Sequence, residues 1–524
     1  MTRYRLPLAW LVAAIIIAEI SCSAGATERP FTEHELNILK VSEGIIRLFE
    51  QHAMEIWPGF DLSKRPFLVY VPEHWALIFN CPHNVEGFSP YPDDWPDLGA
   101  PALYHHGTYR NLVGQLAFNF EIDSVVTCAV GLPEKFTESF ENPTLSAFSY
   151  IVHEEFHQYQ RGSFGEIQWA REERYPIQDV ENSSLAYLEM AVLVDALTAM
   201  KTDDREKCLE LIGLFIALRN QRWSLSGPFV EKYEQGQEIN EGTAKYIELK
   251  SVDLMTGLKY ESSLHGLTKP LIESFSTISM PDFLIDIFQK YMDNGCVSPE
   301  DVIRNRIYPV GSAQGFLLDY LGIDWKGMAQ EAGPYITFAG LFQERLGIRE
   351  NRFDELVAEA KRIYDYETIL RATSRSIEAF NAGYEKELSA FHKQRGYQFE
   401  VDFFYRSIKR SRLSKSKKWV VDKGTYTLCS FFAVYTLENK DLSLQVHDAA
   451  VMEKNDWDNK RKTVICYVSD LDTIEIDGQA ARLEEDVQYG FKSIRLLCEN
   501  LDFQSEKPGT ITRSSSGIRI SLAQ

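Results

Sequence analysis

The sequence predicts an α+β fold in which strands precede a mostly helical region and a second set of strands follows it. From about residue 143 to residue 395, apolar residues recur almost throughout at the spacing of a helix. Strand-like runs lie before this region, and short β-rich runs separated by Gly, Asn and Asp turns lie after residue 419. A chain of 524 residues exceeds one ordinary core, so we expect two or three domains.

Residues 1–26 have the composition of a cleaved export signal. Arg3 and Arg5 provide a positive start, residues 6–20 are mainly apolar, and small residues lead to a cleavage position after Ala26. Lipid attachment at Cys22 is an alternative, but the residues just before it fit that modification poorly. We therefore expect a periplasmic or secreted protein with no integral membrane segment after cleavage, because no later run of about 20 apolar residues follows.

The bulk composition excludes some classes of function. The formal net charge is −21, which argues against binding to nucleic acid and to anionic lipid headgroups. The cysteines are far apart and form no CxxC pair, so the sequence does not indicate a disulfide framework.

Residues 27–142 are expected to form the N-terminal α/β part of a catalytic region. Apolar spacing predicts one helix, and runs of apolar residues predict three strands. These elements are the helix 32–55 and the strands 67–71, 115–121 and 124–130.

Residues 143–400 are expected to form the helical part of the same region. Asn142 as N-cap and Pro143 in the first turn predict the start of a helix that runs through His157 to about Gly162. Further helices are predicted at 183–201, 205–222, 238–256, 281–293, 311–321 and 351–394.

The end of the chain is expected to form a separate β domain. Residues 401–418 are basic and predict a solvated linker, and residues 419–524 predict a small β-sandwich-like domain. Its strands are expected at 425–436, 443–447, 463–468, 473–477, 493–498 and 517–522.

The helix after Asn142 carries the residues of a metal site. His153, Glu154 and His157 form an HExxH pattern, in which the histidines stand one turn apart on one face and can bind one zinc ion, Zn²⁺. Glu154 lies beside them, where its carboxylate can act as a general base on the metal-activated water. A zinc site with a purely structural role needs no general base, so the presence of Glu154 favours a catalytic site over a structural one.

A third ligand is needed, because a catalytic zinc usually has three protein ligands and one open position. No histidine lies between His157 and His265, so a carboxylate is required. Two helices with similar sequences offer one. The first offers Glu181 and Glu189, and the second offers Glu241.

The second of these helices carries a family resemblance. HExxH at His153–His157 followed by the sequence NEGTAKYIE from Asn240 to Glu248 resembles the gluzincin metallopeptidases with an aminopeptidase-type catalytic domain. The resemblance implies a thermolysin-like catalytic domain and gives Glu241 the role of third zinc ligand. The gap of 84 residues between His157 and Glu241 is longer than is typical of the group, and an inserted helical hairpin between about 181 and 222 would account for it.

A further segment extends the resemblance. The sequence YPVGSA from Tyr308 to Ala313 is similar to the tyrosine–glycine element of the same group, which implies that Tyr308 stabilises the oxyanion of the tetrahedral intermediate. A tyrosine that merely packs at a helix start is the alternative. The Gly-x-Met-Glu-Asn segment that binds the free amine in aminopeptidases is absent from the sequence.

The sequence therefore predicts an exported zinc metallopeptidase that acts on peptide or protein substrates. In this hypothesis a zinc-activated water attacks the peptide bond with Glu154 as general base. The alternative is a non-catalytic surface or scaffold protein with a gluzincin-like fold, whose β domain binds a partner or a glycan. Hydrolysis of a non-peptide bond is a third possibility.

Overall fold

The structure is a computed structural model, and it describes residues 31–523 apart from several internal gaps. The gaps are 111, 113–115, 123–124, 135–141, 165–171, 258–278, 333–335, 405–408 and 415–416. The expected export signal and Cys22 lie outside the described residues. The described chain has an α+β fold, as expected, and divides into two compact units. The first contains residues up to 155 with 254–277, and the second contains the remainder.

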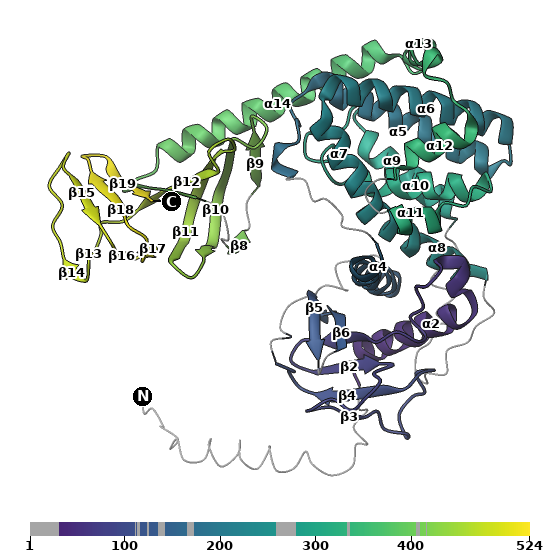
Figure 1. The fold of residues 1–524 in the computed structure, drawn as a ribbon, viewed down its shortest axis with the longest axis horizontal. Coiled ribbons are helices and arrows are strands. Elements are labelled where there is room, and N and C mark those ends of the chain that lie inside the picture. Colours follow the sequence, from purple (N-terminus) through teal and green to yellow (C-terminus); the bar gives the residue numbers. More distant parts are fainter. Residues whose placement is uncertain are drawn as a thin grey trace, which may run out of the picture. The chain divides into compact units, whose positions relative to one another are not determined.

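The first unit contains a six-stranded sheet in the order β3-β4-β2-β1-β6-β5. Among the pairings described, only β1 and β6 run parallel. The helix α2 (Glu33–Ile56) lies beside this sheet (Figure 1) and begins with a capping box between Thr32 and Glu35. The strands are β1 (Phe67–Val71), β2 (Trp75–Phe79), β3 (Ser89–Pro90), β4 (Ala102–His106), β5 (Leu116–Ile122) and β6 (Val125–Gly131).

The helix α4 (Pro143–Ser163) carries the predicted metal motif and begins where the sequence indicates. The Asn142 side chain accepts a hydrogen bond from the backbone N–H of Leu145 at 2.9 Å, so it caps the helix as expected. Glu155 is fully buried, and the backbone groups that interact with its carboxylate are those of Leu68 and Cys128 in the sheet. This contact orients α4 within the first unit.

The second unit contains the predicted helical region. Its helices are α5 (Val180–Lys201), α6 (Arg205–Ser226), α7 (Pro228–Gln237), α8 (Thr243–Gly257), α9 (Met280–Met292), α10 (Ile307–Tyr320), α11 (Lys326–Ala332), α12 (Phe338–Leu346), α13 (Phe353–Ile363) and α14 (Tyr366–His392). In length and composition α5 alone among the described helices could cross a membrane, but most of its apolar window is buried inside the protein.

Three helices of the structure, α7, α11 and α12, have no counterpart among the predicted helices, and two predicted helices differ in form. The helix expected over 351–394 is divided into α13 and α14, because Asp365 adopts a left-handed conformation with φ of 48°. The helix expected over 238–256 begins instead with a π turn at Glu238–Gly242 before α8. Local sequence patterns do not distinguish such a turn from an α-helix.

The C-terminal β region is one curled sheet of thirteen strands, and not two stacked sheets. Residues expected to form a linker belong to it, because β7 includes residues 401–404 and β8 pairs with β10. The strands are β7 (Tyr397–Phe404), β8 (Lys409–Ser414), β9 (Lys418–Val421), β10 (Tyr426–Glu438), β11 (Leu442–Asp456), β12 (Arg461–Val468), β13 (Thr473–Ile476), β14 (Gln479–Ala480), β15 (Gln488–Phe491), β16 (Ile494–Cys498), β17 (Leu501–Ser505), β18 (Gly509–Arg513) and β19 (Gly517–Leu522).

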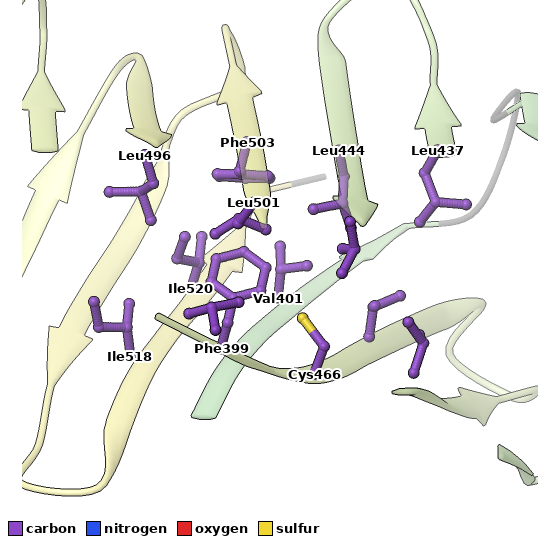
Figure 2. Close-up of a cluster of buried hydrophobic side chains, with 14 of the residues drawn as sticks. Phe399, Val401, Leu437, Leu444, Cys466, Leu496, Leu501, Phe503, Ile518 and Ile520 are labelled. Atoms are coloured by element: carbon purple, nitrogen blue, oxygen red, sulfur yellow. The ribbon is translucent and has the colours of Figure 1, made fainter. Parts of the chain in front are cut away.

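The concave side of this curled sheet holds its own hydrophobic core. Figure 2 shows Phe399 and Val401 of β7 close to Phe503 of β17, with Cys466 and Ile520 beside them. Alternate residues of β12 are buried, which is the pattern of a sheet with one covered face. Because one sheet curls around its own side chains, the core needs no second sheet.

Candidate metal centre

The structure brings His153, His157 and Glu241 together. The candidate ligand atoms of the three residues all lie within 4.8 Å of one another. The two histidines stand one turn apart on α4, and His157 Nε2 lies 3.2 Å from Glu241 Oε2. Ligands about 2.0–2.1 Å from one tetrahedral zinc ion are about 3.4 Å apart, so the His157–Glu241 distance matches that geometry.

The π turn at Glu238–Gly242 positions Glu241. A π turn widens the helix by one residue and is often found at functional sites. All five residues of the turn are buried, and Glu241 itself is 6% exposed. Asn240 Nδ2 donates a hydrogen bond to Glu241 Oε1 at 3.3 Å, which leaves Oε2 directed to His157.

Gln160 connects α4 to this turn. Its side-chain nitrogen lies 3.2 Å from the carbonyl oxygen of Ile239, 2.8 Å from that of Asn240 and 2.7 Å from Thr243 Oγ1. Carbonyl oxygens only accept hydrogen bonds, so the NH₂ end of the amide must face them. Gln160 Oε1 therefore faces His157 Nδ1, at 2.7 Å. An amide oxygen only accepts, so Nδ1 of His157 carries a proton.

This assignment determines what His157 presents to Glu241. In a neutral imidazole the proton on Nδ1 leaves Nε2 with a lone pair. That lone pair would face a carboxylate oxygen at 3.2 Å in a buried site, which is unfavourable without a positive charge. Either a proton on His157 or a metal ion supplies it. Two imidazoles and one carboxylate form a ligand set that suits zinc with one open position.

Tyr308 lies beside the same carboxylate. It stands in the first turn of α10, and its hydroxyl accepts hydrogen bonds from Arg304 Nε at 3.1 Å and Nη2 at 2.9 Å. Burial, together with the negative charge of Glu241, raises the pKa of Tyr308, and Arg304 opposes this rise. Tyr308 is therefore a protonated donor at neutral pH and lies next to a candidate ligand.

Glu154 and Glu155 lie in different surroundings although they are neighbours. Burial and then the charge of Glu154 raise the pKa of Tyr150, so Glu154 lies near that phenol. Burial raises the pKa of Glu155 well above its usual value, and its carboxyl group interacts with the sheet of the first unit. Of the two, Glu154 is the half-buried residue.

Glu189 and Glu181, the other carboxylates considered for the metal, lie in other surroundings. Glu189 is fully buried between Arg219 and Arg222, with Oε1 2.6 Å from Arg222 Nε and Oε2 3.0 Å from Arg219 Nη2. Glu181 is exposed in the first turn of α5. Neither belongs to the group formed with His153 and His157.

A buried ionic network stabilises the helices behind the π turn. It contains Arg219, Arg222, Arg306, Glu189, Glu234 and Glu238, and all six are 2% exposed or less. Three positive groups compensate three negative ones, as burial of charge requires. Gln314 of α10 donates to Glu238 at 3.0 Å, so the network connects the π turn to α10.

Two residues of the centre could not be identified from sequence motifs. Gln160 contacts residues about 80 positions away, and Arg304 precedes the tyrosine motif by four residues. The sequence offers one weak signal for each of them, a spacing of three or four residues. Gln160 is three residues after His157, and Tyr308 is four residues after Arg304, and residues so spaced can share a helix face.

Comparison with models of protein families, with characterised proteins and with solved structures finds no match to this chain.

Proposed function

We propose that this protein is an exported zinc metallopeptidase with a thermolysin-like catalytic domain. His153, His157 and Glu241 would hold the metal, and the resemblance of their sequence context to the gluzincins supports this assignment. The proximity of the three side chains supports it independently of sequence, because Glu241 is 84 residues from His157 in the chain.

One observation carries the proposal. The proton on His157 Nδ1 is directed to Gln160, so Nε2 presents its lone pair toward the Glu241 carboxylate. Two groups that both donate electron pairs are stable at 3.2 Å in a buried site when a cation lies between or beside them. A divalent metal ion meets this requirement and leaves both histidines neutral, as metal ligation demands.

The catalytic roles follow from the positions of the remaining side chains. When bound, the metal ion acts as a Lewis acid on the scissile carbonyl and lowers the pKa of water. Glu154 takes a proton from the attacking water and passes it to the leaving amine. The Tyr308 hydroxyl donates a hydrogen bond to the developing oxyanion and keeps its proton, while Arg304 holds the phenol oxygen in place through two N–H groups.

The proposed substrates are peptides or proteins, and the proposed cleavage is not restricted to removal of the N-terminal residue. The sequence has no Gly-x-Met-Glu-Asn segment to hold a free amine, so recognition of the substrate N-terminus has no assigned residues. This favours a peptidase that does not require a free amino terminus.

A peptide-library digestion tests the function. The mature protein should cleave library peptides, a chelator should stop cleavage, and added zinc should restore it. N-terminally acetylated peptides should be cleaved as well as free ones. Stoichiometric zinc without cleavage of any peptide would favour the scaffold protein, and cleavage that survives full metal removal would contradict the proposal.

A further inference from the structure

We infer that Gln160 is a positioning residue that sets the tautomer of His157 and the distance between His157 and Glu241, and thereby the affinity of the metal site. The inference rests on the proposed metal function. It concerns a residue outside the HExxH motif and outside the candidate ligands. Gln160 is 1% exposed, so water does not compete for its hydrogen bonds.

The oxygen end of the Gln160 amide acts on the imidazole of His157. A histidine ligand usually donates its second ring N–H to an acceptor, which determines which nitrogen is left to bind the metal. Here the acceptor is Gln160 Oε1, 2.7 Å from His157 Nδ1, and the two residues lie one turn apart on α4. The proton on Nδ1 leaves Nε2 to bind the metal, and Nε2 is the atom that faces Glu241.

The nitrogen end of the Gln160 amide contacts the π turn that carries Glu241. Gln160 Nε2 lies within hydrogen-bond distance of the Asn240 carbonyl and of Thr243 Oγ1, at 2.8 and 2.7 Å. Thr243 Oγ1 in turn donates to the carbonyl of Ile239 at 2.5 Å. One amide therefore connects a histidine of α4 to the backbone just before Glu241 and to the side chain of Thr243 just after it.

The two ends of the amide have different consequences. The oxygen end orients the ligand His157, and the nitrogen end holds the π turn that carries the ligand Glu241. A substitution that removes both ends should release both ligands. Replacement of outer partners of metal ligands commonly lowers metal affinity by about 10–100-fold.

The test uses Gln160→Leu, with Gln158→Leu as the matched control on the same helix. In the described chain, Gln158 Oε1 accepts a long hydrogen bond of 3.5 Å from Arg161 Nη1 on the same helix. Zinc dissociation constants are measured by competition with a chromophoric chelator. We expect about 10–100-fold weaker binding in Gln160→Leu and unchanged binding in Gln158→Leu.

Nitrogen NMR of ¹⁵N-histidine-labelled, metal-free protein provides a second readout that a purely structural role would not move. The His157 signal is identified by its loss in His157→Gln. The metal-free wild type should keep a proton on Nδ1, in the Nδ1–H tautomer or in the imidazolium that faces Glu241, and Gln160→Leu should show the Nε2–H tautomer instead. Gln160→Glu keeps the acceptor for His157 but has no N–H for the π turn, so it should retain the proton on Nδ1 and bind zinc better than Gln160→Leu.

The outcomes separate this inference from the proposed function. Equal zinc affinity of wild type and Gln160→Leu, or an Nε2–H tautomer in the metal-free wild type, would overturn the role of Gln160 and leave the metallopeptidase intact. Absence of zinc binding in the wild type would instead refute the proposed function, and the tautomer measurement would still decide the role of Gln160. If Gln160→Leu does not fold, the comparison of Gln160→Glu with the wild type decides it.

Discussion

Gly242 and Gly311 are in direct backbone contact. A Cβ atom built on either residue would lie 2.7 Å from the Cα atom of the other, closer than real Cβ atoms approach other atoms. Gly242 ends the π turn that carries Glu241, and Gly311 lies one turn after Tyr308 in α10. The contact explains why the two sequence motifs both contain glycine, and it places the candidate third ligand and the candidate oxyanion donor side by side.

Alanine at Gly311 should therefore separate the two elements. The neighbour is backbone, which cannot rotate away, so we expect Gly311→Ala to destabilise the fold by about 1–3 kcal/mol and to weaken zinc binding. The matched control is Gly213→Ala in α6, where an added Cβ meets nothing within 4 Å. Urea unfolding and zinc titration measure both effects. Equal stability of the two variants would refute the contact.

Glu154 should be needed for turnover and not for the metal. Glu154→Gln keeps the shape of the side chain and removes its basicity, so hydrolysis should fall by about two to four orders of magnitude while zinc content stays the same. Initial rates and metal analysis check this. Glu181→Gln, an exposed position, serves as control. Unchanged turnover in Glu154→Gln would remove this residue as general base.

Tyr308 should affect the chemical step more than substrate binding. Loss of one oxyanion donor commonly lowers kcat by about 10²–10³, so Tyr308→Phe should show this decrease with little change in KM. Arg304 is half exposed, so water can replace the lost acceptor and the melting temperature should change little. Tyr320→Phe, at the other end of α10, should retain full activity. A change confined to KM would argue for a binding role.

The buried carboxylate of Glu234 should make stability depend on acid. Burial raises its pKa, but Arg222 and Arg306 more than offset this and hold the pKa well below the usual 4.5. A depressed carboxyl pKa contributes stability that is complete above about pH 4.5 and is lost as the pH falls toward the folded-state value.

Urea unfolding of the wild type and Glu234→Gln over a pH series checks this dependence. The wild type should lose unfolding free energy more steeply than the variant below about pH 4.5. Burial and the charge of Glu234 raise the pKa of Glu238, so Glu238 opposes this dependence in the wild type and opposes it less in Glu234→Gln. Parallel stability curves would show that Glu234 is not ionised in the folded protein.

Sequence patterns could predict the elements that depend on local periodicity and short motifs. The start of α4 at Asn142 and Pro143 follows from capping, and the spacing of His153 and His157 follows from one helical turn. The pairing with Glu241 required a family resemblance, because periodicity says nothing about which distant helix crosses beside α4.

Features that depend on tertiary contacts were not predictable in this way. The break at Asp365 is a single left-handed residue inside an otherwise helical pattern. Residues Lys409–Ser414 form a strand despite their many positive charges, because β10 provides a pairing partner along their length. The role of Gln160 appears only when α4 and the π turn lie together.

The metal content of the purified mature protein tests the central claim most directly. We predict about one zinc ion per chain in the wild type, retained in Glu189→Gln and lost in His157→Ala and Glu241→Ala. Glu189→Gln is the informative control. It removes a negative charge that pairs with two buried arginines, so it should lower stability, but it leaves the candidate ligands unchanged. Full zinc content in His157→Ala and Glu241→Ala, or a wild type that binds no zinc when it is supplied, would contradict the account.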